Sequence, residues 1–320
     1  MNLELALAAG ISSGTVLLFA AIGELFAERA GVINLGVQGM MFVGALVGFS
    51  VGYNIDPWLG VVLAMVAGAL LAALHGLVTI HLQANQIVSG LALTFLGTGV
   101  ALVLGEGLPS GSSPLLPAVT LPLLADIPFV GAVFFSEQSI LVYAGYLLVP
   151  LTSIWIFRTR PGLHLRAVGE QPSAADALGV NVYRQRYAYV MLGGALAGLA
   201  GAYMTMSQVP GWHADQTFIA QGWIAVALVI FGQWKPGRTM FGAYMTAFIF
   251  RLSLDLQGPK ELFGIPNIFY EYGPSTFVLG MLPYITVILV LVFAASEANR
   301  KRIGAPAALG TPYVRGERGH

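Results

Sequence analysis

The chain has 320 residues, of which 57% are hydrophobic and only 9% are charged, and Lys plus Arg equal Asp plus Glu at 15 each. Soluble domains carry about 25% charged residues, so a water-soluble globular protein of this size is excluded and most of the surface is expected to face lipid. The absence of cysteine excludes disulfides, thiol chemistry and Cys-based metal sites.

Apolar stretches long enough to cross a hydrocarbon core of about 30 Å recur along the whole chain. No basic segment precedes the first stretch, which favours a membrane span over a cleaved signal peptide. We predict an all-α integral membrane protein, a polytopic helical bundle of about nine membrane-spanning helices in one transmembrane domain (1–298), followed by a tail (299–320). The spans are predicted at 3–23, 36–53, 58–79, 86–104, 138–157, 187–206, 220–232, 239–256 and 275–295.

Two polar stretches interrupt this pattern early in the chain, ERAGVINLGVQGMM (28–41) and LQANQIVSG (82–90). Amides and hydroxyls at membrane depth usually join helices, but they also line pathways that hydrogen-bond a neutral polar solute. Both interpretations stay open at this point. The candidates for a translocation pathway are Asn34, Gln38, Asn85, Gln86 and Ser89.

The segment 105–137 is rich in Pro, Gly and Ser and contains no Lys or Arg. It is too long for a simple connection. We expect this extracytoplasmic loop to cover the outer mouth of the bundle or to contact another protein, and we predict a short apolar helix at 129–136.

Residues 158–186 join two spans with about thirty residues where a handful would suffice. In this loop Ser173 and Asp176 have the spacing of a capping box, and Gly179 stands where a glycine commonly ends a helix. The pattern predicts a helix of about one and a half turns, which is too short to be stable alone. Its exposed face would be small and apolar and would need a partner groove; the residues of that face are Ala174, Ala175 and Leu178.

Three side chains inside the spans could titrate or carry charge. Arg251 and Asp255 lie one turn apart on one helix face, and a carboxylate there lowers the cost of an arginine at membrane depth. We predict an intramembrane ion pair with a structural role, because a proton relay would need a second titratable partner. His75, inside the third span, is predicted to hydrogen-bond between helices rather than to act in catalysis.

Basic residues gather on one side of the predicted bundle. When loops are assigned to alternate sides, the opposite side carries Lys260 alone, and Arg251 lies within a span. Such a bias marks the basic side as cytoplasmic, so we expect the N-terminus outside and the C-terminus inside; the tail after Arg302 is predicted to be disordered. The basic residues on this side are Arg29, Arg158, Arg160, Arg166, Arg184, Arg186, Lys235, Arg238, Arg300, Lys301, Arg302, Arg315 and Arg318.

The common enzyme motifs are missing from the sequence. No GxxxxGK[ST] loop occurs, so the chain does not hydrolyse ATP by that route, and no HExxH or similar cluster supports a membrane metalloprotease. We predict no catalytic residue, no metal, no cofactor and no nucleic-acid partner. A membrane enzyme is therefore disfavoured, and an ion-coupled transporter working alone lacks the buried acids that it would need.

Four blocks together resemble the permease subunits of ABC importers for branched-chain amino acids, simple sugars and nucleosides, most closely the nucleoside type. The third block carries most of the resemblance, and Gln38 in the first stands where many nucleoside-type members have Glu. The blocks are ERAGVINLGVQGMMFVGA (28–45), NQIVSGLALTFLGTG (85–99), TRPGLHLRAVGEQPSAADALGVNVYRQRY (159–187) and GWIAVALVIFGQWKPGR (222–238).

This resemblance implies a multi-pass protein of the cell (inner) membrane that forms the pathway for a small polar solute. A nucleoside is the first candidate, with a simple sugar or a branched-chain amino acid as the alternatives. It implies a second permease, identical or paralogous, a cytoplasmic ABC ATPase dimer and an extracytoplasmic solute-binding protein. It further implies that the 158–186 loop couples the permease to the ATPase. The candidate coupling residues are Gly169, Glu170, Ala174, Ala175, Leu178 and Gly179.

Overall fold

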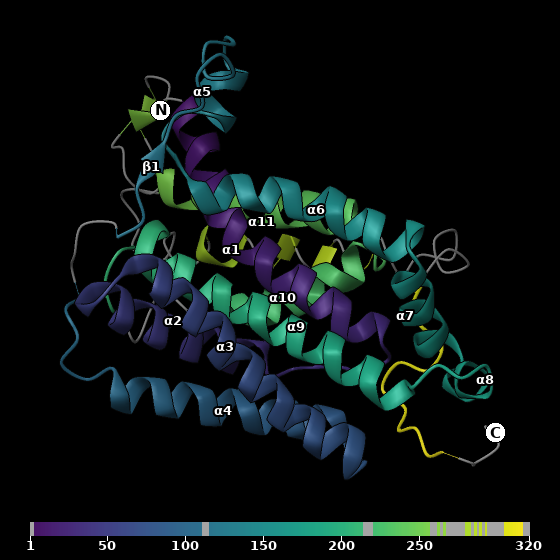
Figure 1. The fold of residues 1–320 in the computed structure, drawn as a ribbon. Helices are drawn as coiled ribbons and strands as arrows, with labels where there is room; N and C mark the ends of the chain where they lie inside the picture. The colour runs from purple at the N-terminus through teal and green to yellow at the C-terminus, as the bar shows by residue number, and fades with distance from the viewer. Residues whose placement is uncertain are drawn as a thin grey trace.

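The computed structural model describes residues 3–110, 115–213, 220–256, 261–262, 265–266, 279–282, 285–286, 288–289, 292 and 304–315. Within these residues the protein is a bundle of long helices with α1 (Leu3–Arg29) in the middle (Figure 1). The start of α1 and helix α5 (Val130–Phe134) lie at one end of the bundle, and α7 (Arg160–Glu170) and α8 (Pro172–Ala177) lie at the other. We call the latter the α7–α8 end.

The remaining elements complete the bundle and two small ribbons. Strands β1 (Ala118–Val119) and β2 (Gln138–Ser139) pair antiparallel, as do β3 (Glu261–Leu262) and β4 (Ile265–Pro266). The π-helical turns η1 and η2 continue α3 and α9. The other helices are α2 (Val37–Asn54), α3 (Pro57–Gly76), η1 (Leu77–His81), α4 (Gln86–Leu104), α6 (Ile140–Arg158), α9 (Val182–Tyr203), η2 (Met204–Gln208), α10 (Gln221–Phe231) and α11 (Pro236–Asp255).

Short polar side chains fix where several helices begin. Asp56 accepts a hydrogen bond from the Leu59 amide at 2.8 Å, immediately before Pro57 opens α3. Such a cap satisfies an amide that the first helical turn leaves without a partner. Asn85 at α4, Ser139 at α6 and Asn181 at α9 act in the same way.

Helix α1 is the buried centre of the bundle. Every residue from Gly14 to Ala30 is buried, and the helix packs against α9, α10 and α11. Its apolar side chains cover all faces of the helix, as expected for a helix surrounded by other helices. The outer helices instead keep large apolar side chains exposed, such as Phe95 of α4 and Leu147 of α6. An apolar outer surface around a packed interior is the arrangement of a helical membrane protein.

Backbone contacts between glycines bring the central helices together. A Cβ atom on Gly193 of α9 would lie 2.7 Å from the carbonyl oxygen of Gly23 on α1, closer than side-chain contacts normally allow. Other faces of α9 meet α3 and α2 in the same way, because small residues permit close helix packing in membranes. These further contacts join Gly194 with Gly68, and Gly198 with Gly44 and Ala64.

Most of the predicted spans coincide with helices. Helices of the structure cover the predicted ranges from 3–23 to 239–256, whereas the range 275–295 lies mostly outside the described residues. Five described helices are both long and apolar enough to cross a membrane, so the polytopic helical class is confirmed, while the number of nine spans stays a prediction. These five are Glu4–Arg29, Pro57–His81, Gln86–Leu104, Ile140–Arg158 and Val182–Gln208.

The end of the bundle opposite α7–α8 is covered by the 105–137 segment. Leu116 is buried, and its amide donates to the carbonyl of Met206 in η2 at 3.3 Å. Tyr143 of α6 donates its hydroxyl to the carbonyl of Val119 at 2.8 Å and so holds the β1–β2 ribbon. Helix α5 confirms the short helix that the sequence predicts at 129–136.

Two glycines of α4 provide a matched test of the close packing. A Cβ on Gly97 would lie 2.5 Å from the carbonyl oxygen of Gly39 on α2, whereas a Cβ on the exposed Gly99 would meet nothing within 4 Å. We expect Gly97→Leu to lower the thermal unfolding midpoint of the purified protein, because overpacking costs about 1–3 kcal/mol. Gly99→Leu should leave it unchanged; equal midpoints for the two variants would contradict the packing.

Candidate functional site

The segment between α6 and α9 holds two helices instead of the single one predicted. Thr159 accepts a hydrogen bond from the Gly162 amide at 3.2 Å and caps α7, and Pro161 occupies its first turn. A second proline, Pro172, opens α8 directly after Gln171. Proline fits the first turn of a helix but cannot continue a preceding one. The segment therefore consists of two consecutive short helices that lie at the end of the bundle (Figure 1).

Helix α8 ends as the sequence predicts but begins differently. Gly179 adopts a left-handed φ of +85°, and the Val180 amide donates to the Ala175 carbonyl at 3.0 Å, the pattern of a glycine-terminated helix. Ser173 is the second residue of the helix. The residue before the helix is Gln171, and no side chain caps the first turn. The predicted capping box between Ser173 and Asp176 is therefore wrong, because Pro172 already fixes the first turn.

The exposed side of α8 is narrower than predicted. Leu178 is 86% exposed, and Ala174 and Gly179 are exposed beside it. Ala175 is only 3% exposed because it packs against Val168 of α7. The prediction that Ala175 belongs to the free face is thus wrong, and the helix presents its C-terminal end.

Two more coupling candidates lie behind α8, at the end of α7. Gly169 is buried, and a Cβ there would clash with the carbonyl oxygen of Arg29, the last residue of α1. Glu170 is exposed, and its carboxylate accepts a hydrogen bond from the Ala307 amide at 3.2 Å. Gly169 thus packs α7 against the end of α1, while Glu170 stays exposed and bonds the Ala307 amide.

Residues 304–315, which we call the strap, run along the α7–α8 end. The strap forms backbone hydrogen bonds from Ala308 to Gly169 at 2.9 Å and from Gly310 to Gly31 at 3.2 Å. The prediction of a disordered tail is therefore wrong for this part. Its bonding partners are backbone carbonyls of distant segments, which a sequence pattern does not reveal.

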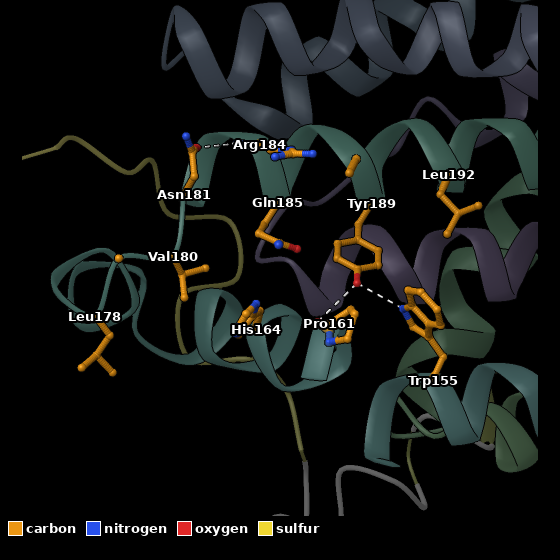
Figure 2. A pocket seen from close by; sticks show the side chains of 12 residues that line it. Trp155, Pro161, His164, Leu178, Val180, Asn181, Arg184, Gln185, Tyr189 and Leu192 are labelled. Carbon is orange, nitrogen blue, oxygen red and sulfur yellow. Dashed lines mark hydrogen bonds between the residues drawn. The ribbon is translucent and has the colours of Figure 1, made fainter. Parts of the chain in front are cut away.

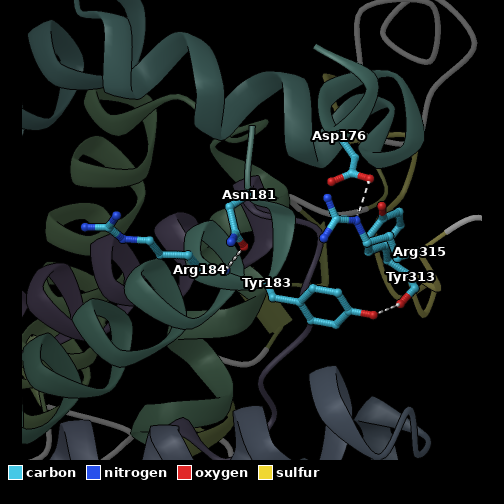
Figure 3. A network of polar contacts seen from close by, with 6 residues as sticks. All are labelled: Asp176, Asn181, Tyr183, Arg184, Tyr313 and Arg315. Atoms are coloured by element: carbon cyan, nitrogen blue, oxygen red, sulfur yellow. Dashed lines mark hydrogen bonds and ion pairs between the residues drawn. The ribbon is translucent and has the colours of Figure 1, made fainter. Parts of the chain in front are cut away.

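The strap holds α8 through its last described residues (Figure 3). Tyr313 is 7% exposed and packs with Ala175, Val168 and Val182. The Tyr183 hydroxyl donates to the Tyr313 carbonyl at 3.3 Å, and Arg315 forms an ion pair with Asp176 at 3.3 Å. Helix α8 is thus held from behind while its C-terminal end stays free.

A pocket of about 800 Å³ opens beside this free end, between α7 and α9 (Figure 2). At its far side the Trp155 indole of α6 donates to the Tyr189 hydroxyl of α9 at 3.1 Å. Leu178 forms part of its rim, and its lining includes Arg184 and His164 but no acidic side chain. Leu178 and the pocket together form one recessed surface with a positive character.

Most of the five pathway candidates lie around the turn between α1 and α2. Asn34 is 1% exposed and accepts the Gly36 amide at 3.0 Å, and Gln38 accepts the Gly222 amide of α10 at 2.5 Å. Gln86 accepts the Ile33 amide at 2.8 Å. Gln38 and Gln86 thus bond backbone amides of other segments and join helices, whereas Asn34 bonds an amide within its own turn.

The other two candidates lie at the start of α4. Ser89 is buried and bonds Nδ1 of His75 at 3.0 Å, while Nε2 of His75 bonds the Ile33 carbonyl at 3.0 Å. His75 thus joins α3, α4 and the turn, as the sequence predicts. Asn85 is exposed, caps α4, and lines with Gln86 a cavity of about 450 Å³ against the strap.

Charged side chains of the helices form one predicted pair, which is partly exposed, and one unpredicted pair, which is buried. Arg251 and Asp255 form the expected ion pair, with Nη2 and Oδ1 3.0 Å apart. Glu24 and Glu28, which sequence reasoning missed, are 1% and 3% exposed. The sequence feature that indicates this pair is the spacing of two glutamates one helical turn apart in GELFAERAG (23–31). Among the described residues, no group of three His, Asp or Glu side chains could hold a metal ion.

The comparisons agree with this architecture. The family described as "Branched-chain amino acid transport system / permease component" matches residues 6–291. The chain is 39% identical over 319 residues to a putative glucose ABC transporter permease protein, TsgC13, of Haloferax volcanii, covering 96% of each chain.

Two nucleoside transporter components are also similar. The nucleoside ABC transporter permease protein NupC of Lactococcus lactis is 34% identical over 98% of each chain. The guanosine ABC transporter permease protein NupQ of Bacillus subtilis is 35% identical over 94% of each chain. No solved structure matches.

The docking of the strap can be tested with two substitutions two residues apart. Tyr313→Ala should speed hydrogen exchange at the amides of Ala308 and Gly310 by roughly a hundredfold, because truncating a buried aromatic ring costs about 3 kcal/mol. Arg315→Gln removes only an exposed ion pair, which is worth less than about 1 kcal/mol. The arrangement would be disproved if both variants kept the slow exchange of the wild type.

Proposed function

We infer that this chain, which belongs to the family of branched-chain amino acid transport system permease components, forms the translocation pathway of an ABC importer for a sugar or a nucleoside. Such a subunit is a multi-pass membrane protein and performs no bond chemistry. Permeases of this kind work with ATPase subunits and a binding protein.

We propose that the α7–α8 end faces the cytoplasm. Arginines are concentrated at this end: Arg158 ends α6, Arg160 and Arg166 lie in α7, Arg184 and Arg186 lie in the first turns of α9, and Arg29 ends α1. The loop around β1 and α5 carries no Lys or Arg. This orientation puts the N-terminus outside and the C-terminus inside. It also exposes α8 to soluble partners and the 105–137 loop to the solute-binding protein.

The surface that supports coupling to an ATPase is the free end of α8. Leu178 is 86% exposed and stands at the tip of a helix that the strap fixes from behind, so its side chain is accessible to a partner. Ala174 and Gly179 beside it are small enough for a close approach. We propose that these three residues contact the ATPase, whereas Gly169, Glu170 and Ala175 hold α7 and α8 in position.

The pocket beside Leu178 extends this contact. It has a mixed polar and apolar lining with Arg184 and no acidic side chain. A neutral or acidic side chain of the partner fits such a lining, because it gains a charge-assisted bond without repulsion. The ATPase would therefore contact both the C-terminal end of α8 and the pocket beside it.

This attachment provides a mechanism for alternating access. Closure of two ATPase subunits would move α8, and the backbone contacts of α7 with the end of α1 would pass the movement to the central helix. Packed helices shift as rigid bodies between discrete arrangements. The two permeases of the importer, copies or paralogues, would open alternately outward and inward.

We propose that the polar junctions around residue 34 shape the pathway from behind rather than contact the solute. The side chains of Asn34, Gln38 and Gln86 already accept hydrogen bonds from backbone amides. A solute would have to break these bonds to use the same oxygens. Their function is then to hold the turn at 30–36 between α2, α4 and α10.

We propose a nucleoside as the solute, because two of the three relatives reported above are nucleoside or guanosine permeases. A simple sugar is the second candidate, since the glucose relative is 39% identical. Both are neutral and rich in hydroxyl groups.

The coupling proposal can be tested with two leucines on opposite ends of the molecule. Leu178→Arg should abolish binding of the cognate ATPase and solute-stimulated ATP hydrolysis, because a charged side chain replaces the apolar tip. Leu123→Arg changes a leucine that is 83% exposed at the other end and should preserve binding of the ATPase. Full ATPase activity in a folded Leu178→Arg complex would refute the proposed contact.

The solute can be identified with the importer reconstituted in liposomes. Accumulation of labelled guanosine should exceed that of labelled glucose and leucine at equal concentration, and unlabelled nucleosides should compete. Faster accumulation of glucose would assign the chain to sugar transport instead. Accumulation without the ATPase would show a transporter that works alone and would overturn the ABC assignment.

A further inference from the structure

Two glutamates near the end of α1 have no role in the mechanism proposed above. Glu24 and Glu28 lie one turn apart on the same face of the helix, and the protein itself buries them to 1% and 3% exposure. Buried carboxyl groups are costly unless they are paired or hydrogen-bonded. Their surroundings therefore indicate how the protein tolerates them.

Each carboxyl group binds a different turn at the α7–α8 end. Oε1 of Glu24 accepts the amide of Asn34, in the turn between α1 and α2, at 2.9 Å. Oε2 of Glu28 accepts the indole N–H of Trp234, in the turn between α10 and α11, at 2.5 Å. The pair thus connects α1 to two turns that are 200 residues apart in the sequence.

The two carboxyl groups lie one helical turn apart on the same face of α1. Oε2 of Glu24 is buried and has no hydrogen-bond partner among the described residues. Ionised carboxylates only accept hydrogen bonds, so a bond between two carboxyl groups requires a proton on one of them. Placing that proton between Glu24 and Glu28 gives the unpartnered oxygen its missing bond.

No cation substitutes for this proton. Arg29, the nearest basic residue in the sequence, directs its guanidinium to the Trp234 carbonyl at 2.8 and 3.2 Å. No Lys, Arg or His of the described residues forms an ion pair with Glu24 or Glu28. Two ionised carboxylates one helical turn apart and away from water would repel each other strongly.

The charged groups of the neighbouring elements have other partners or other positions. His75 of α3 bonds Ser89 and Ile33, and Arg238 of α11 bonds Gln233. Lys235 is exposed to solvent. On α7, Arg166 and Glu170 interact electrostatically with Arg29. The α9 surface against α1 includes Gly193, Leu196 and Tyr189, which stacks on Phe26, while Arg186 of α9 lies beside Gly31 and donates to the Thr311 carbonyl.

The turn that Glu28 holds is conformationally strained. Gln233 and Trp234 both have left-handed φ angles, 50° and 53°, although neither is glycine. Each such residue costs about 1–3 kcal/mol and persists only where its surroundings hold it. Glu28 accepts a hydrogen bond from the indole of Trp234, and Arg29 donates to the Trp234 carbonyl. Side chains of α1 therefore bond both the side chain and the backbone of this residue.

We propose that Glu24 and Glu28 form a proton-binding site in which one shared proton fastens α1 to the 30–36 and 232–235 turns. With the proton bound, both turns stay in place at the inner end of the central helix. As the pH rises and the proton leaves, repulsion between the two carboxylates loosens the junction. The stabilisation is therefore present at low pH and lost at alkaline pH, and it does not depend on which solute is transported.

Infrared spectroscopy of the purified chain in D₂O tests the shared proton directly. At neutral pH the wild type should show the carbonyl band of a protonated carboxyl group, and the band should disappear in Glu24→Gln and in Glu28→Gln. Glutamine keeps the oxygen that accepts from Asn34 or Trp234, so both variants should fold. Glu106→Gln, which changes an exposed glutamate, should keep the band. A wild type without the band, or a band retained in both single variants, would overturn the shared proton.

The pH dependence of the thermal unfolding midpoint tests whether the shared proton stabilises the junction of α1 with the two turns. The wild-type unfolding midpoint should fall between mildly acidic and alkaline pH, and this fall should be smaller in Glu24→Gln and Glu28→Gln, because one carboxylate next to an amide has no repelling partner. The Glu106→Gln control should follow the wild type. If the variants and the wild type lost stability in parallel, the proton would not hold the junction.

A measurement on the wild type alone covers the case in which either variant fails to fold. The infrared band of the protonated carboxyl group should then disappear over the same pH range in which the unfolding midpoint falls. A band that persists while the midpoint falls refutes the proposal.

Discussion

Close backbone contact around α9 is the constraint on which this structure depends. In lipid, helices gain little from burying apolar surface against one another, so they associate through tight packing and polar contacts. Glycines on α9 meet α1, α3 and α2 on different faces, with Gly193 against Gly23 as the contact to the central helix. Because these contacts involve backbone atoms, they allow little adjustment, and the helices behave as one rigid group.

The α7–α8 end combines that rigid group with surface elements held by polar bonds. Helix α7 reaches the end of α1 through Gly169, and the strap bonds to both α7 and the 30–36 turn. The buried carboxyl pair and Trp234 connect the same end of α1 to the turn before α11. A force applied to the tip of α8 would therefore act on the central helix and on both turns beside it.

The local features of this end were predictable from sequence, whereas its long-range contacts were not. Gly179 predicts the end of α8 because a left-handed residue after a short helix is a local requirement. The burial of Ala175 depends on Tyr313, which is 138 positions later in the chain. The strap has no periodic pattern, and its order comes from bonds to Gly31 and Gly169 that only folding brings within reach.

The amino-acid sequence was sufficient to show that this is a helical membrane protein. A chain with 9% charged residues and repeated apolar stretches faces lipid, where its segments must form helices that satisfy their own backbone hydrogen bonds. It also determined the family, through polar blocks that interrupt those stretches. Tertiary structure alone decided which polar side chains are free. Asn34, Gln38 and Gln86 look alike in the sequence as candidates for binding a solute, yet each side chain already accepts a backbone amide. The amide comes from another segment for Gln38 and Gln86, and from Gly36 in the same turn for Asn34. Hydrogen-bond satisfaction depends on neighbours in space, which helix periodicity does not specify.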